Sequence, residues 1–278
     1  MIHIVLRLKR NQGDPGMTTE NTEEIHSFGF EDVSKNEKVD RVKGVFRSVA
    51  SKYDIMNDLM SAGVHRLWKA DTMAKLNPQP GESLLDVAGG TGDLAKAFID
   101  RAAKAGRRRG RKVHDARAIV CDINDAMLEA GRARRDMAPY EDMISWVCGD
   151  AENLPFEANR FDALTIAFGI RNVAGRQKAL EEFARVLKPG GRLAILEFSH
   201  MTAPLLQQAY DTYSFNIIPP MGAIVAGDRE SYQYLVESIR RFPKQDDFAK
   251  EIETAGFSKV NVTNFSGGIA ALHTGWVV

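Results

Sequence analysis

The residues best suited to chemistry form a glycine-rich loop, Gly89-Gly90-Thr91-Gly92, between an apolar run and a helix-like segment. Residues 84–88 before it are long enough for a buried strand, and Asp93 opens a segment with helical spacing. A strand, a tight glycine turn and a helix N-terminus leave backbone N–H groups unpaired, and glycines let a ligand approach the main chain closely. The loop is therefore a candidate ligand cradle.

The composition of the loop favours one kind of ligand over others. It matches neither the dinucleotide motif G-x-G-x-x-G nor the phosphate-binding motif G-x-x-x-x-G-K-[ST]. Asp93 suits a ligand that carries an ammonium group, such as the methionine part of S-adenosylmethionine. The alternative is an ordinary turn in which Asp93 caps the following helix.

Two further acids each follow a strand-like run. Asp122 ends the run 119–121, and a carboxylate there can accept hydrogen bonds from both hydroxyls of a ribose. Asp150 follows the run 144–148 and is placed to accept a hydrogen bond from an adenine amino group; its alternative role is that of a turn acid. These acids and the loop together predict a nucleoside site.

The elements that position these residues alternate between strands and helices. Residues 161–168 predict a strand that leads into Gly169-Ile170-Arg171-Asn172-Val173, residues 176–187 an amphipathic helix, and residues 192–198 a buried strand. This rhythm predicts a parallel sheet with helices on both faces, and ligands of such sheets bind at the carboxyl ends of the strands. Two closing strands, 260–265 and 269–277, predict a final antiparallel hairpin, as in class I methyltransferases.

Two segments interrupt the alternation. Residues 43–76 have interrupted helical spacing and either pack in the core or cover the mouth of the cradle. Met56 in this segment either packs in the core or contacts an apolar substrate. Tyr53 and Asn57 are better site candidates, because a polar group on an apolar helix face needs a hydrogen-bond partner. The aromatic-rich residues 202–241 predict a lid over the site.

Composition sets the remaining bounds. The 278 residues contain 37 Lys+Arg and 37 Asp+Glu, so no global field favours nucleic acid as a partner. Two cysteines give neither a disulfide framework nor a metal motif. We expect residues 1–30 to be disordered or a mis-assigned extension, with translation starting at Met17, and residues 31–278 to form a single domain. The basic stretch 104–117 predicts a solvated loop.

Several stretches resemble the ubiquinone/menaquinone biosynthesis C-methyltransferase family, from about His26 to the C-terminus. They are Tyr53-Asp54 with Met56-Asn57-Asp58, the loop 85–93, the segment 168–173, and residues 187–193. The resemblance implies a class I S-adenosylmethionine-dependent methyltransferase with a Rossmann-like, mostly parallel seven-stranded sheet. It also implies that Thr91, Asp122, Asp150 and Ala151 bind this cofactor beside Gly89 and Gly90. Ala167 stands where some members carry a cofactor-binding serine.

The family methylates a ring carbon of polyprenyl hydroquinones, namely 2-polyprenyl-6-methoxy-1,4-benzoquinol or demethylmenaquinol. A quinone carbon is electrophilic, whereas a quinol that loses a phenolic proton pushes electron density onto the neighbouring carbon. Arginine is effectively always protonated, so we expect Arg171 to stabilise the phenolate, with Asn172 and Tyr53 positioning the hydroxyl. Met56 and Asn57 join Tyr53 and Arg171 as expected substrate contacts. The alternative for Arg171 is a salt bridge to Asp228 or Glu230.

The resemblance also suggests partners and a location. A prenyl tail must be drawn from a bilayer, so we expect a bacterial cytoplasmic protein with peripheral contact on the inner face of the membrane. A complex with other quinone-biosynthesis enzymes and a homodimer are further expectations, and no nucleic-acid partner is expected. Two rival functions stay open: a nicotinamide oxidoreductase, and a non-catalytic cofactor-binding subunit of a quinone-synthesis complex.

Overall fold

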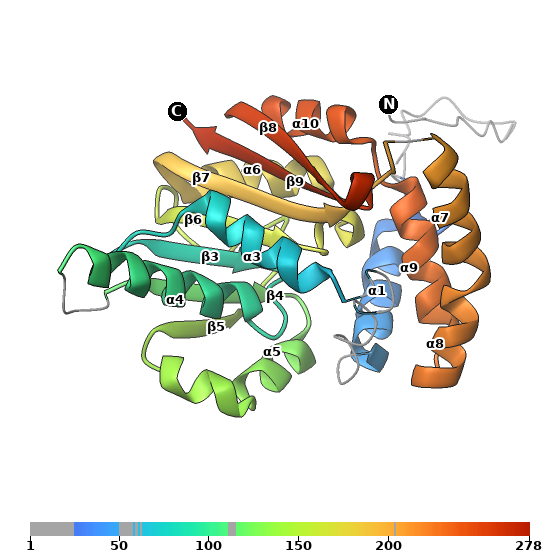
Figure 1. Ribbon diagram of the computed structural model, residues 1–278, viewed down its shortest axis with the longest axis horizontal. Helices are drawn as coiled ribbons and strands as arrows, with labels where there is room; N and C mark the ends of the chain where they lie inside the picture. The colour runs from blue at the N-terminus through green and yellow to red at the C-terminus, as the bar shows by residue number, and fades with distance from the viewer. Residues whose placement is uncertain (1–24, 50–57, 59–60, 62, 111–114, 203) are drawn as a thin grey trace, which may run out of the picture.

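The computed structural model describes residues 25–49, 58, 61, 63–110, 115–202 and 204–278, which build an α/β fold around one large sheet (Figure 1). The sheet has the strand order β5-β4-β3-β6-β7-β9-β8, and all neighbours are parallel except that β9 is antiparallel to β7 and β8. The strands are β3 (Ser83–Val87), β4 (Arg117–Asp122), β5 (Ile144–Cys148), β6 (Phe161–Ala167), β7 (Leu187–Phe198), β8 (Phe257–Phe265) and β9 (Ala270–Val277). The predicted sheet and its C-terminal antiparallel hairpin are confirmed.

Helices cover both faces of this sheet because the central strands are apolar on both sides. Leu84 of β3 packs in one buried cluster with α3 and α4, whereas Leu85 packs in another with α6 and α10. Successive strand side chains point to opposite faces, so a continuous apolar run requires cover on each. The covering helices are α3 (His65–Leu76), α4 (Asp93–Arg108), α5 (Asp125–Arg132), α6 (Arg176–Val186) and α10 (Gln245–Thr254).

A further group of helices, which we call the helical layer, lies beyond the carboxyl ends of β3 and β4 (Figure 1). It consists of α1 (Lys35–Val49), α7 (Pro204–Asn216), α8 (Ile218–Ala226) and α9 (Arg229–Arg241). The 3-10 turn η3 (Ile170–Asn172) lies between β6 and α6. Two further 3-10 turns are η2 (Arg135–Tyr140), between α5 and β5, and η4 (Ser266–Gly268), between β8 and β9. In the described ranges, no helix is long and apolar enough to cross a lipid bilayer.

Part of the stretch that the sequence assigns to an N-terminal extension forms regular structure. Strands β1 (His26–Phe28) and β2 (Glu31–Val33) pair as a small antiparallel hairpin. The ring of Phe28 stacks on Tyr234 of α9 at a centroid distance of 4.1 Å. The expectation of disorder up to residue 30 is therefore wrong for residues 26–30, because the contact between Phe28 and Tyr234 fixes the hairpin. A contact between residues so far apart in the sequence cannot be predicted from the local pattern.

Two other boundaries differ from the sequence prediction. Helix α4 continues to Arg108, so the start of the basic stretch 104–117 is helical and not a loop. Its apolar side chains recur every three or four residues up to Ala102, and a last basic turn favours a helix C-terminus. Strand β7 begins at Leu187 and includes the glycine pair that the sequence suggests would stop a helix.

Candidate functional site

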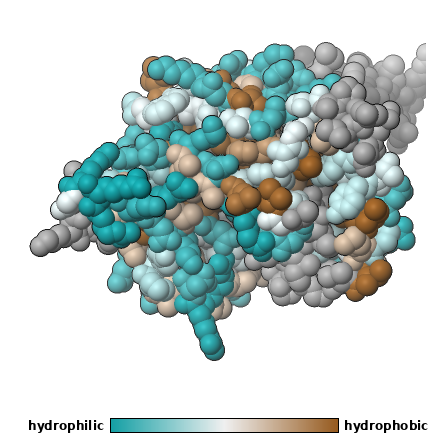
Figure 2. All heavy atoms as spheres, viewed as in Figure 1, coloured by the Kyte–Doolittle hydropathy of each residue, from teal (hydrophilic) through white to brown (hydrophobic). Residues whose placement is uncertain are grey.

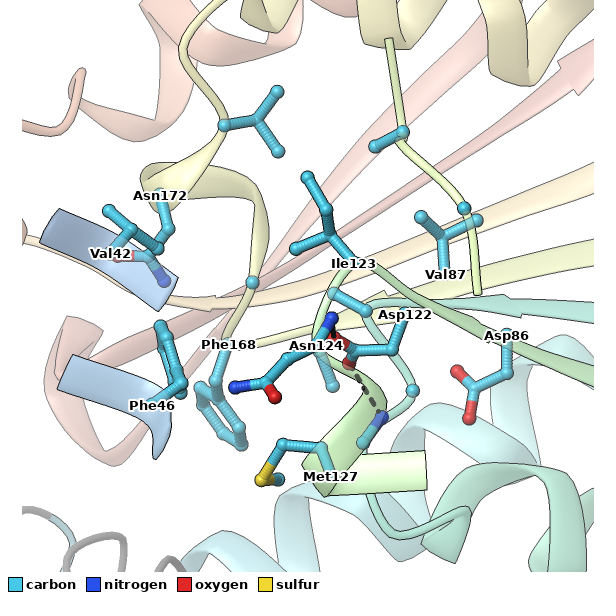
Figure 3. Close-up of a pocket in the computed structure, with 18 of the residues that line it drawn as sticks. Val42, Phe46, Asp86, Val87, Asp122, Ile123, Asn124, Met127, Phe168 and Asn172 are labelled. Carbon is cyan, nitrogen blue, oxygen red and sulfur yellow. Dashed lines mark hydrogen bonds between the residues drawn. The ribbon is translucent and has the colours of Figure 1, made fainter. Parts of the chain in front are cut away.

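An open pocket of about 1100 Å³ lies at the carboxyl ends of β3, β4 and β6 (Figure 3). Its walls include the glycine loop, the turns after β4 and β5, and the segment after β6. Seven predicted site residues line it: Gly89, Gly90, Thr91, Asp122, Asp150, Ala151 and Asn172. The strand register brings these ends together, since Val87 of β3 pairs with Cys121 on one side and Ile166 on the other.

The glycine loop turns sharply from β3 into α4. Gly90 and Gly92 have φ values of 52° and 81°, in the left-handed region that favours glycine. A Cβ added to Gly89 would meet the backbone oxygen of Asp86 and Cγ1 of Val120 at 2.8 Å, so no side chain fits there. The loop therefore presents bare backbone to the pocket, as predicted.

Asp122 is held rigidly at the end of β4. Its Oδ2 accepts a hydrogen bond from the Gly90 N–H at 2.9 Å, drawn as a dashed line in Figure 3, and its Oδ1 accepts one from the Asn124 N–H at 2.9 Å. Burial raises the pKa of this carboxyl to about 6, whereas the backbone hydrogen bonds oppose the rise. A fixed carboxylate with lone pairs left over suits two adjacent hydroxyl donors, as a ribose offers.

Asp86 is a site residue that the sequence reasoning missed. It lies on β3, lines the pocket, and accepts a hydrogen bond from Thr165 Oγ1 at 2.7 Å through Oδ1. Its buried Oδ2 has no hydrogen-bond partner in the described part of the chain, and burial raises its pKa to about 7. The available signal was a single acid inside the apolar run 84–88.

Asp93, the acid expected to bind an ammonium group, is already paired with two cationic side chains. Its two oxygens contact Lys69 at 3.0 Å and Arg134 at 2.5 Å. Although burial opposes it, these two cations lower the Asp93 pKa to about 2. Among the described residues of this pocket, Asp86 has a buried carboxylate oxygen without a partner, so Asp86 is the better acceptor for a ligand ammonium.

Arg171 and Asn172, adjacent on η3, have different environments. The Arg171 side chain is 2% exposed, and its Nη1 donates to Glu197 Oε1 at 2.7 Å and to the Phe168 carbonyl at 2.6 Å. Its partner is therefore Glu197 of β7, in place of the Asp228 or Glu230 named as alternatives. Arg171 does not line the pocket, whereas Asn172 does.

Asn172 is oriented by a residue of α9. Tyr234 Oη donates to Asn172 Oδ1 at 2.8 Å, so the amide presents Nδ2 as its remaining donor. That nitrogen is buried and has no acceptor within the described ranges. Tyr234 is a second functional candidate that the sequence reasoning did not single out.

Cover for the pocket comes from α1. Val39, Val42, Lys43 and Phe46 line it, and Figure 3 shows Val42 and Phe46 close to Asn172 and Phe168. None of the described lining residues comes from the expected lid, 202–241. This segment reaches the pocket only indirectly, through the hydrogen bond from Tyr234 to the lining residue Asn172. Tyr53, Met56 and Asn57 lie outside the described residues, so their roles stay predictions.

The pocket fits S-adenosylmethionine on this chain's own geometry. Asp122 is placed for the ribose hydroxyls, Asp86 offers an unpaired carboxylate oxygen for the ammonium group, and Asp150 stands beside them. Apolar side chains, including Ile123 and Met127, also line the pocket and suit the flat face of an adenine. Carboxylate acceptors and apolar side chains together suit a ligand that carries an ammonium group, two hydroxyls and a flat base.

Comparisons with known proteins identify the family of this chain. The sequence profile of the ubiE/COQ5 methyltransferase family matches residues 32–277. A relative from Cereibacter sphaeroides (strain ATCC 17029), named ubiquinone/menaquinone biosynthesis C-methyltransferase UbiE, is 56% identical over 262 residues, or 94% of this chain and 100% of the relative. A mitochondrial 2-methoxy-6-polyprenyl-1,4-benzoquinol methylase from Danio rerio is 50% identical over 272 residues, or 90% of this chain and 83% of that protein.

Solved structures of lower identity share the fold. An S-adenosylmethionine-dependent methyltransferase from Aquifex aeolicus aligns with a TM-score of 0.52 at 15% identity, over 76% of this chain and 89% of that one. A chain of the complex between the Haloferax volcanii Trm112 activator and a putative methyltransferase aligns at 0.57 and 16% identity, over 85% and 97%. Together with the profile and the close relatives, these findings mean that the chain belongs to the ubiE/COQ5 methyltransferase family and is an S-adenosylmethionine-dependent methyltransferase.

Proposed function

We propose that this enzyme methylates a ring carbon of a polyprenyl hydroquinone in ubiquinone or menaquinone biosynthesis. The observation that carries the proposal is the pocket wall opposite the acids. Val39, Val42 and Phe46 of α1 give that wall apolar surface, Lys43 of the same helix also lines it, and Asn172 Nδ2 offers an amide donor. An apolar ring with a hydroxyl at its edge has this pattern, and the printed names of the relatives supply the ring chemistry.

The chain's residues act on the substrate through position and charge. Bound S-adenosylmethionine supplies a methyl group on an electron-poor sulfonium centre. Asn172 Nδ2 is available to donate a hydrogen bond to the phenolic oxygen and so favours its ionised form. The ionised oxygen would push its electron pair toward the neighbouring ring carbon, which would form the new carbon–carbon bond as the methyl–sulfur bond breaks and S-adenosylhomocysteine leaves. The ring carbon would then lose its own proton to restore aromaticity.

Arg171 contributes through η3. Its ion pair with Glu197 and its bond to the Phe168 carbonyl fix the turn that carries Asn172. We therefore assign Arg171 a positioning role: it favours the phenolate by fixing the turn that presents Asn172 to the pocket. Tyr53, Met56 and Asn57 are assigned to the substrate side, Tyr53 as a positioning partner of the hydroxyl.

The test is a methyl-transfer assay read by mass spectrometry. Short-tailed demethyl benzoquinol and naphthoquinol are each incubated with enzyme and S-adenosylmethionine under reducing and oxidising conditions. We expect a gain of one methyl group only under reducing conditions, and the ring that reacts identifies the pathway. Transfer to neither ring by an enzyme that still binds S-adenosylhomocysteine contradicts the proposal and favours a non-catalytic subunit.

We further propose that α8 contacts the membrane from which the prenyl tail is drawn. Residues 212–227 contain no charged side chain, although the chain as a whole is 27% charged. Ile217 and Ile224 are 44% and 84% exposed, and Figure 2 shows hydrophobic surface over α8 at the right-hand edge. An exposed apolar helix face of this kind suits a lipid interface.

Vesicle co-sedimentation tests this contact. Ile224→Glu should release the protein from vesicles, whereas Leu67→Glu, at an apolar α3 residue that is 66% exposed, should not. Equal sedimentation of both variants and the native chain contradicts a lipid-facing α8. A homodimer and a complex with other quinone-biosynthesis enzymes remain proposals, and light scattering of the purified chain tests the first of them.

A further inference from the structure

A second recess, of about 300 Å³, lies on the other side of η3. Arg171 lines this recess while its neighbour Asn172 lines the cofactor pocket, so the turn contributes to both walls. Four cationic side chains surround it: Lys38 of α1, Arg171, Arg176 at the start of α6, and Arg241 at the end of α9. No carboxylate is among the lining residues in the described part of the chain.

The three arginines have carboxylate partners outside the recess. Arg171 pairs with Glu197 at 2.7 Å, Arg176 with Glu251 at 2.5 Å, and Arg241 with Asp32 at 3.6 Å. These pairs neutralise the arginines, so the guanidinium groups alone do not call for another anion.

Lys38 differs from them. It is 5% exposed, and its Nζ donates to the Val173 carbonyl at 3.3 Å, but no described carboxylate lies within 4.0 Å of that nitrogen. An ammonium group has three N–H donors, so two of them have no partner among the residues that the structure describes. Burial and the positive charge of Arg176 lower the pKa of Lys38 to about 8, whereas the negative charge of Glu152 opposes this shift. At neutral pH the group is still mostly protonated.

Arg171 adds a second unpaired donor. Its Nε is buried and has no hydrogen-bond partner among the residues that the structure describes. A buried charge or donor without a partner is costly, and proteins normally satisfy it with a counter-charge or a bound ion. Both donors belong to residues that line this recess, and none of its described lining residues is an acid.

We propose that this recess is an anion site that binds an oxyanion of phosphate size between Lys38, Arg171, Arg176 and Arg241. The charge matches, because a phosphate offers several acceptor oxygens to cationic donors that come from different elements. Arg241 is 41% exposed on its side chain, which gives the recess an opening to solvent.

Occupancy of this site also affects the cofactor pocket. Lys38 immediately precedes Val39, which lines that pocket from α1, and Arg171 immediately precedes Asn172. An anion that ties Lys38 to Arg171 therefore holds the α1 cover against η3. We expect phosphate to tighten binding of S-adenosylhomocysteine, and S-adenosylhomocysteine to tighten binding of phosphate by the same factor.

The experiment is calorimetric titration of the full chain with inorganic phosphate, at constant ionic strength maintained with chloride. The native chain should bind phosphate, and Lys38→Met should weaken that binding at least about tenfold. Lys250→Met removes an exposed lysine paired with Asp247 and serves as the matched control, with no change expected. Arg241→Gln, at a half-exposed position, gives an independent smaller loss if Lys38→Met does not fold.

Three outcomes overturn the proposal. They are no phosphate binding by the native chain, equal binding by Lys38→Met, and competition between phosphate and S-adenosylhomocysteine, which would place the anion in the cofactor pocket. Glycerol 3-phosphate in a parallel titration distinguishes a lipid phosphate from free phosphate as the source. Binding of phosphate without any effect on S-adenosylhomocysteine affinity would overturn the coupling alone.

Discussion

The floor and the cover of the cofactor pocket are built in different ways. The floor consists of the glycine loop, Asp86 and Asp122, which sheet hydrogen bonds and short backbone contacts position. The cover consists of α1 and η3, which contacts between side chains far apart in the sequence position, including Lys35 with Glu152 and Tyr234 with Asn172. A parallel sheet thus fixes the floor, whereas the position of the cover depends on a few long-range contacts.

The largest expected effect falls on the anchor of the cover. Glu197→Ala leaves the Arg171 guanidinium buried without its counter-charge, and loss of one member of a buried pair typically costs about 3 to 5 kcal/mol in the free energy of unfolding. Urea denaturation measures this loss. Glu197→Gln, which keeps a hydrogen-bond acceptor, should cost less, and a cost under about 1 kcal/mol for the alanine variant would mean that the pair does not anchor η3.

The next effect falls on the floor. Asp122→Ala removes an acceptor for two hydroxyls and a partner of the Gly90 N–H, so S-adenosylhomocysteine should bind about a hundredfold more weakly. Asp125→Ala, at an exposed acid three residues along the chain, is the control and should leave affinity unchanged. Calorimetry gives both values. If the two variants behave alike, Asp122 does not contact the ribose.

The floor should also respond to pH. Burial raises the pKa of Asp86 to about 7, and an ammonium group needs the ionised carboxylate. Cofactor affinity should therefore fall about tenfold between pH 8 and pH 6, with one proton released on binding near pH 6. Asp86→Asn should flatten this profile, and an unchanged profile in that variant would assign the titration to another group.

Asp86 and Asp122 affect the stability of the cofactor-free protein in the opposite direction: their contribution falls as the pH rises, whereas cofactor affinity increases. Because the folded-state pKa values of Asp86 and Asp122 lie above the value of about 3.9 in an unfolded chain, the folded state binds more protons between roughly pH 4 and 7. Their contribution to the free energy of unfolding of the cofactor-free protein is therefore largest at low pH and decreases as pH rises through this window. Bound cofactor should reduce the loss.

The difference between floor and cover also separates what the sequence could predict from what it could not. Asp122 and the glycine loop follow from local rules, because a strand end and a turn define their geometry. Glu197 was visible only as one acid in a buried strand, and its pairing with Arg171 spans 26 residues. The hairpin at residues 26–33 has no apolar run of its own and depends on Phe28 stacking against Tyr234. Tyr53, Met56 and Asn57 stay predictions.

The smallest expected effect tests the finest contact of the cover. Tyr234→Phe removes the hydroxyl that orients the Asn172 amide but leaves the stacked ring with Phe28, so the fold should persist. Loss of one neutral hydrogen bond is typically worth about 1 kcal/mol, or about fivefold in turnover, with S-adenosylhomocysteine affinity unchanged. Tyr140→Phe removes a comparable bond to Asp100 at the protein surface and should change neither quantity. A loss of cofactor affinity in Tyr234→Phe equal to the loss of turnover would show that floor and cover are not separable, because the hydroxyl would then support the cofactor and not only the substrate side.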